Sequence, residues 1–203
     1  MNKLIGVVGV MGTGKTTLCA ESGCEFIKTD VSGIYKKRGL DPKEAMSLDT
    51  RLDVQEEILE YHCQLWLKAC VRGNQDGKRF VSENKVLVTD RTPLCFMTFT
   101  LCEISGYDKL TEAQDMRLKG YIHRCWIAMT MFKGIMYLGQ SFTPPVDLSE
   151  KIRASMSYGY REHHDNVQKG LVSSITTGTP VARCLTSDKV IRKMMLGKLA
   201  DNC

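Results

Sequence analysis

Five short apolar runs alternate along the chain with longer segments of helical character. The runs that predict buried strands are Leu4–Val8, Glu25–Asp30, Lys85–Asp90, Gly134–Leu138 and Val172–Thr176. Short apolar runs bounded by polar residues are typical of strands that are covered on both faces. Because these runs alternate with helices, the pattern predicts an α/β fold in which a five-stranded parallel sheet is sandwiched by helices.

The segments between these runs predict the helices. From Thr50 to Val71, apolar residues recur at helical spacing, and Thr50 is a suitable N-cap. The other helices are expected over Thr17–Ala20, Val31–Arg38, a segment that Asp41-Pro42 opens, a segment that follows Pro93 and runs through Leu101, Leu110–Met131 (one helix or two), Leu148–Lys169 and Ser187–Leu199.

The size and charge of the chain narrow the class of protein. With 203 residues it has room for one α/β domain with a full core, so we expect residues 1–203 to form a single domain. No stretch approaches 18 uninterrupted apolar residues, so we expect no membrane span. We also expect no signal peptide, because the first predicted strand begins without a basic n-region. The net charge of +5 suits a polyanionic ligand.

The cysteine pattern indicates structural thiols. Nine cysteines are present and none forms a C-x-x-C pair, which disfavours a zinc ribbon or a thioredoxin-type site. Cys63 and Cys70, like Cys95 and Cys102, are seven residues apart in helical segments and so share a helix face. We expect core thiols in a protein of the reducing cytoplasm.

The segment after the first predicted strand is a complete G-x-x-x-x-G-K-[ST] phosphate-binding loop. We expect Lys15 to reach the β- and γ-phosphates of a nucleoside triphosphate, and the Thr16 hydroxyl to hold Mg²⁺. The backbone of the loop and the start of the following helix would surround the phosphates. The residues expected to bind the nucleotide here are Gly9, Val10, Met11, Gly12, Thr13, Gly14, Lys15, Thr16 and Thr17.

A carboxylate ends the third predicted strand. A parallel sheet places the ends of its strands at one edge, so Asp90 is expected beside the phosphate loop, where it would support Mg²⁺ through water. Asp90 also suits the N-cap of a helix that begins near Pro93, and both roles are compatible. Arg91 would contact phosphate groups or form a structural ion pair.

Asp30 ends the second predicted strand at the same edge of the sheet. In a phosphoryl-transfer enzyme, a carboxylate there can accept the proton of an attacking hydroxyl group. A phosphate acceptor is already ionised and needs no base, so Asp30 favours a hydroxyl acceptor. The alternative is that Asp30 only caps the local loop. The acceptor pocket itself is expected to include Tyr35, Gln55, Tyr61 and Trp66.

Residues 143–170 are expected to form a basic lid. Arg153 and Arg161 are eight residues apart, so one helix face could present both to the triphosphate. A solvated basic helix is the alternative. Neighbouring His163 and His164 cannot share a helix face and do not make a metal site. Thr179 and Pro180 follow the last predicted strand, where they would contact the nucleotide base or form a plain turn.

Taken together, these residues resemble the P-loop kinase superfamily of small nucleoside and nucleotide kinases, over nearly the whole chain. Thr89-Asp90-Arg91-Thr92-Pro93 is similar to the D-R-[STY] motif of thymidylate kinases, deoxynucleoside kinases and nicotinamide riboside kinase-like domains. The resemblance implies a P-loop kinase fold with a helical lid, ATP and Mg²⁺ as cofactors, and Asp30 as general base. The lid lacks a clear D-G-x-R form; Leu148–Arg153 stands in its place.

The stretch from Thr29–Gly33 to Arg51–Gln55 looks like that of kinase-like proteins of bacterial viruses. Some of these phosphorylate hydroxymethyluracil within DNA, which makes DNA a candidate partner, and related kinases are often dimers.

We therefore expect an ATP- and Mg²⁺-dependent kinase in which Lys15, Asp30, Arg91, Arg153 and Arg161 are catalytic. Its acceptor would be a hydroxyl group of a nucleoside, a nucleotide or a modified pyrimidine base. A thymidylate-like mononucleotide kinase is the alternative. A P-loop ATPase switch and a nucleotide-binding protein without catalysis are the alternatives from other classes, although Asp90 is followed by Arg91 rather than by a water-polarising Glu.

Overall fold

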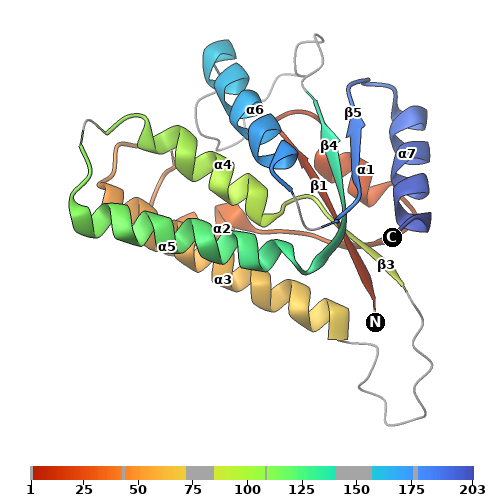
Figure 1. The fold of residues 1–203 in the computed structure, drawn as a ribbon, viewed down its shortest axis with the longest axis horizontal. Helices are drawn as coiled ribbons and strands as arrows, with labels where there is room; N and C mark the ends of the chain where they lie inside the picture. The colour runs from red at the N-terminus through yellow and green to blue at the C-terminus, as the bar shows by residue number, and fades with distance from the viewer. Residues whose placement is uncertain (1, 43, 72–84, 108, 140–156, 176–177) are drawn as a thin grey trace.

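A five-stranded sheet forms the centre of the molecule. The computed structural model describes residues 2–42, 44–71, 85–107, 109–139, 157–175 and 178–203. All strands pair in parallel in the order β2-β3-β1-β4-β5, which confirms the predicted α/β fold (Figure 1). The strands are β1 (Lys3–Gly9), β2 (Glu25–Ile27), β3 (Val86–Thr89), β4 (Phe132–Leu138) and β5 (Val181–Cys184).

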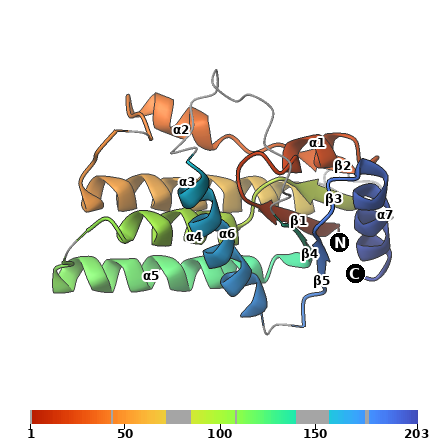
Figure 2. The same ribbon diagram turned by 90° about the horizontal axis from the view of Figure 1, so that it is seen from above.

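Helices cover both faces of this sheet. The described helices are α1 (Lys15–Ala20), α2 (Val31–Lys37), α3 (Leu48–Val71), α4 (Pro93–Ile104), α5 (Glu112–Met129), α6 (Tyr158–Ser173) and α7 (Lys189–Asp201). The long helices α3, α4 and α5 lie side by side as one layer, and α1 and α7 lie together at the other face (Figures 1 and 2). Among the described helices, none is both long enough and apolar enough to cross a membrane.

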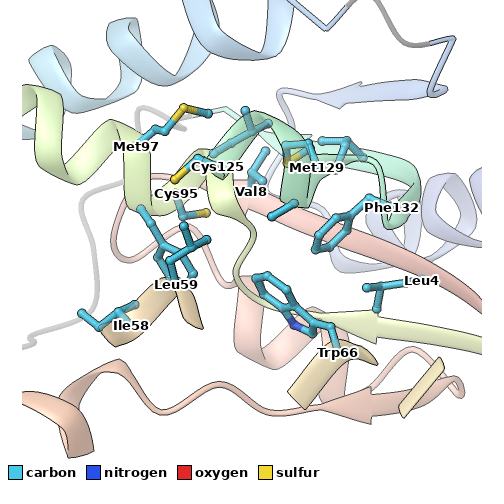
Figure 3. Close-up of a cluster of buried hydrophobic side chains, with 14 of the residues drawn as sticks. Leu4, Val8, Ile58, Leu59, Trp66, Cys95, Met97, Cys125, Met129 and Phe132 are labelled. Atoms are coloured by element: carbon cyan, nitrogen blue, oxygen red, sulfur yellow. The ribbon is translucent and has the colours of Figure 1, made fainter. Parts of the chain in front are cut away.

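The central strand β1 contributes apolar side chains to the core on both sides of the sheet. Side chains alternate across a strand, and β1 is apolar on both faces. Leu4 and Val8 pack into the core beneath α3, α4 and α5, whereas Ile5 and Val7 pack into the core beneath α1 and α7. Figure 3 shows side chains of the larger core, where Trp66 of α3 lies near Phe132 of β4, with ring centroids 5.1 Å apart.

Two predicted elements are wrong. The described part of Val172–Thr176, residues 172–175, is not a strand: Val172 is buried in the last turn of α6, and the fifth strand begins at Val181. A short apolar run cannot be distinguished from a buried helix end by periodicity alone. No helix begins at Asp41-Pro42 within the part of that segment that the structure describes.

The starts and ends of other predicted elements shift slightly. The long helix begins at Leu48 rather than at Thr50, because the Ser47 hydroxyl accepts a hydrogen bond from the Thr50 N–H at 3.1 Å. The segment predicted as one or two helices is the single helix α5, which Thr111 and Gln114 begin with a reciprocal capping box. Of the predicted lid, residues 143–156 lie outside the described residues and the remainder belongs to α6.

The cysteines behave as apolar side chains. All nine are free thiols, and Cys70, Cys95 and Cys102 are buried as predicted, whereas Cys63 is half-buried. Burial raises the pKa of Cys102 to about 12, so this thiol is protonated at neutral pH.

Candidate active site

The phosphate-binding motif forms the connection between β1 and α1. Gly14, the residue before α1, has a φ of +83°, a left-handed conformation that strains any residue with a Cβ. The buried Lys15 ammonium donates hydrogen bonds to the carbonyl oxygens of Gly9 at 2.7 Å and Val10 at 2.9 Å. The Thr13 hydroxyl donates to the same Val10 oxygen at 2.9 Å. The loop is therefore held in shape by its own residues.

A hydrogen-bonded group of oxygen atoms lies next to this loop. The Thr16 hydroxyl donates to Asp90 Oδ2 at 2.5 Å, and the Thr29 hydroxyl donates to Asp90 Oδ1 at 2.9 Å. Asp90 is buried at the end of β3, and the N-cap residue of α4 is Thr92, so Asp90 is not the cap of that helix. The hydroxyl of Thr16 and the carboxylate of Asp90 are the hard oxygen donors that Mg²⁺ prefers.

The oxygen atoms of Thr16 and Asp90 fit Mg²⁺ better than a metal ion that is held by protein side chains alone. Within the described ranges, no group of three or more His, Cys, Asp or Glu side chains could hold a metal ion. Mg²⁺ commonly takes one or two protein ligands and completes its shell with water and substrate phosphates. Thr16 and Asp90 match that arrangement.

Asp30 both caps a helix and faces a cavity. Its carboxylate accepts a hydrogen bond from the Gly33 N–H at 2.9 Å at the start of α2, while the side chain is exposed and lines the cavity. A Cβ at Gly33 would collide with this carboxylate. His62 accepts a hydrogen bond from the Asp30 N–H through Nε2 at 3.3 Å and donates from Nδ1 to the Ile58 carbonyl at 2.7 Å.

His62 therefore fixes the backbone of Asp30. Burial lowers the pKa of His62, which keeps the imidazole neutral so that one nitrogen accepts while the other donates.

One cavity of about 1020 Å³ connects the phosphate loop with a pocket between α2, α3 and α4. At the loop end it is lined by Lys15 and Thr16, and Asp30 lies on its wall. At the far end the lining residues are the aromatic and amide side chains of Tyr35, Gln55, Phe96 and Phe99. The Gln55 amide donates to the Tyr35 hydroxyl at 3.1 Å, which orients both groups.

The predicted acceptor residues divide in two. Tyr35 and Gln55 line the cavity, as expected. Trp66 is fully buried in the core, and Tyr61 is 46% exposed away from the cavity lining.

The other predicted site residues have different placements. Arg91 is half-buried and lines the cavity near the phosphate loop. Arg161 is buried in α6 and is not among the cavity-lining residues. Arg153 lies outside the described residues.

Thr179 and Pro180 precede the last strand instead of following it. The Ile135 N–H donates to the Pro180 carbonyl at 2.9 Å, which places this turn beside the early part of β4, while the phosphate loop follows the carboxyl end of β1. The turn is thus at the opposite edge of the sheet from the phosphate loop. The error follows from the misplaced fifth strand.

Arg192 is a site residue that sequence reasoning missed. This buried side chain of α7 donates from Nη1 to the Thr13 carbonyl at 2.6 Å and from Nε to the Thr186 carbonyl at 2.7 Å. It joins the phosphate loop to the segment after β5. Nothing in the sequence around residue 192 indicates this contact, because its partners are brought together only by the fold.

Comparisons with known proteins show the fold. No protein-family model matches the chain, and no curated protein matches it in sequence. A structure of the NadR protein in complex with NR is similar, with a TM-score of 0.63 and 14% identity; the match covers 98% of this chain and 52% of that chain. The chain therefore spans about half the length of that protein.

Two structures of deoxyadenosine kinase from M. mycoides are similar over their full length. The one with bound dCTP has a TM-score of 0.61 and 15% identity, with 98% of this chain and 100% of that chain covered. The one with products dCMP and a flexible dCDP bound has a TM-score of 0.62 and 14% identity, at the same coverage.

Proposed function

We propose that this protein is a kinase that transfers the γ-phosphoryl group of ATP to a hydroxyl group of a nucleoside-like acceptor. The observation that carries the proposal is that a phosphate-binding loop, a carboxylate and an aromatic-amide pocket line one and the same cavity. Two substrates that exchange a phosphoryl group must meet in one space with the reacting atoms close together. A volume of about 1020 Å³ accommodates a nucleotide and a small acceptor.

The phosphate end would bind the triphosphate. Lys15 would exchange its contacts with loop carbonyls for contacts with phosphate oxygens, and Arg91 would add a second positive charge nearby. Thr16 and Asp90 would hold Mg²⁺, which when bound neutralises charge on the transferring group. Arg153 and Arg161 stay predictions, whereas the turn at Thr179 and Pro180 lies at the opposite edge of the sheet from the phosphate loop.

The acceptor end suits a flat, polar ring. Phe96 and Phe99 offer apolar surface for stacking, and the Gln55 amide presents a donor and an acceptor in one plane. Such a pair is the complement of the edge of a nucleobase. The similar proteins are a deoxyadenosine kinase and a NadR protein in complex with NR, which agrees with a nucleoside acceptor.

Asp30 would act as the general base. It lines the same cavity as the phosphate loop and the acceptor pocket, and its backbone is held by His62. A carboxylate there would accept the proton of the attacking hydroxyl as the new P–O bond forms, while the β-phosphate leaves as part of ADP.

A mononucleotide acceptor is the second candidate, because Arg91 and Lys36 also line the cavity and could bind an acceptor phosphate. A hydroxymethyluracil base in DNA, a viral source, a homodimer and a cytoplasmic location stay predictions from the sequence alone. A P-loop ATPase is the rival from another class, and its turnover would not need an acceptor.

The decisive experiment is to measure ATP turnover with Mg²⁺, first alone and then with deoxynucleosides, mononucleotides and DNA containing hydroxymethyluracil. We expect phosphorylation of a deoxynucleoside and little hydrolysis without an acceptor. Hydrolysis that is independent of every acceptor would favour the ATPase and contradict the proposal.

Lys15→Ala should lower the turnover number by about 10² to 10³-fold, because it removes a charge that acts on the transferring phosphoryl group. Lys37→Ala, at an exposed position of α2, serves as the control and should match the wild type. Equal turnover in the Lys15 variant would refute the role of the loop.

A further inference from the structure

The buried face of α6 is polar, which is unusual for a helix that packs against its neighbours. Arg161, His164, Asp165 and Gln168 are at most 7% exposed and are spaced so that they share one face. A core-facing helix normally presents an apolar stripe there. The polar character of this face therefore needs an explanation other than packing.

Several polar atoms on this face have no hydrogen-bond partner among the described residues. They are Arg161 Nε, His164 Nδ1 and Gln168 Oε1. Asp165 differs, because it accepts hydrogen bonds from the Tyr137 hydroxyl at 2.6 Å and the Lys169 ammonium at 2.8 Å. A buried polar atom without a partner destabilises the folded protein and calls for an explanation.

Of these side chains, His164 is the one that lines the cavity of the phosphate loop. Burial, together with the positive charges of Lys15 and Arg91 and the neighbouring His163, lowers the pKa of His164 to about 3. The imidazole is therefore neutral at physiological pH and carries one N–H donor. A hydrogen-bond donor beside two cationic side chains is a site for an anion.

We propose that His164 donates a hydrogen bond to a phosphate oxygen of the bound triphosphate, so that α6 contacts the phosphates from the wall facing the phosphate loop. The inference rests on the proposed function, which places a nucleoside triphosphate in this cavity. The contact is assigned to His164 because it is the side chain of this buried polar face that lines the cavity. The adjacent His163 is exposed and has no such role.

A role of His164 in ligand binding and a purely structural role predict opposite results when His164 is substituted. His164→Leu removes the orphaned nitrogen and keeps an apolar body of similar size. If His164 serves a ligand, this change should leave the melting temperature equal or higher and weaken phosphate binding. If His164 serves only the fold, it should lower the melting temperature and leave binding unchanged.

The experiment measures the dissociation constant of inorganic tripolyphosphate with Mg²⁺, a probe without base or acceptor. We expect His164→Leu to bind about tenfold more weakly than the wild type, as for the loss of a hydrogen bond to a charged group. His163→Leu is the matched control and should bind as the wild type does. Equal binding by His164→Leu and the wild type would overturn this inference but not the proposed function.

Two further readouts separate the possible failures. A wild-type protein that binds neither tripolyphosphate nor ATP would overturn the proposed function and this inference with it. If His164→Leu does not fold, the binding measurement is made with His164→Asn instead. The imidazole N–H resonance of His164 is then also followed in the wild-type protein. That resonance should shift when tripolyphosphate is added, and a constant resonance would overturn the inference.

Discussion

The two ends of the cavity obtain their functional groups in different ways. At the phosphate end, the groups come from one short connection between β1 and α1, held by the contacts of Lys15 with Gly9 and Val10. At the acceptor end, Tyr35, Gln55 and Phe96 come from three different helices. Local backbone geometry therefore shapes one end, and the packing of α2, α3 and α4 shapes the other. Substitutions should separate the two ends.

The largest expected effect is at Asp30, which lines the same cavity as both ends. Asp30→Asn should lower kcat by about 10² to 10⁴-fold with ATP affinity nearly unchanged, because the amide cannot accept a proton. Asn still offers an oxygen to the Gly33 N–H, so the cap of α2 is kept. Asp188→Asn, at the cap of α7, is the control for capping alone. Near-normal kcat in Asp30→Asn would favour a phosphate acceptor.

At the acceptor end, Gln55→Leu should reduce kcat/KM for the acceptor by about 30-fold, equivalent to about 2 kcal/mol for a lost hydrogen bond in a buried site. The KM for ATP should not change. Gln64→Leu, at an exposed position of the same helix, is the control. If KM for ATP rose in parallel, the two ends would not be independent.

At the phosphate end, Thr16→Ala should reduce the rate about tenfold at limiting Mg²⁺ and regain most of it at high Mg²⁺, since water can replace a hydroxyl ligand. Thr29→Ala removes the other hydrogen bond to Asp90 and should leave the Mg²⁺ dependence unaltered. Identical Mg²⁺ curves for both variants would mean that Thr16 does not hold the metal.

The smallest effect is expected behind the phosphate loop. Arg192→Lys loses the simultaneous contacts with Thr13 and Thr186, so nucleotide affinity should fall by about three- to fivefold, in the range of a single net hydrogen bond. Arg183→Lys, an exposed position of β5, should have no effect. Titration with ATP measures the affinity of both variants. If only the KM for the acceptor changed, Arg192 would act at the acceptor end and the prediction would be wrong.

The same contrast explains what the sequence could predict. The conformation of the phosphate loop was predictable from its motif, because it depends on adjacent positions and on a glycine that tolerates a positive φ. The order of strands and helices was predictable from periodicity, except for the helix expected at Asp41-Pro42 and for Val172–Thr176, which imitated a strand. The error at Val172–Thr176 displaced Thr179 and Pro180 to the wrong edge of the sheet.

The remaining site residues depend on tertiary structure. His62, His164 and Arg192 lie in helices whose local sequence gives no sign of the partners they meet. Tyr61 and Trp66 were wrong for the same reason: one face of α3 points to the cavity, another to the core and a third to solvent. Amphipathic spacing identifies a buried face but not what covers it.

The contact between Arg192 and Thr13 also has a consequence for biosynthesis. These two residues are 179 positions apart, so a ribosome releases the phosphate loop long before it releases the arginine that braces it. The central strand β1 must likewise wait for β3 and β4 before it is paired on both sides. Distant pairings of this kind slow folding and leave apolar segments exposed during synthesis. A nascent chain that ends before α7 would carry the complete nucleotide-binding motif without the brace that holds it.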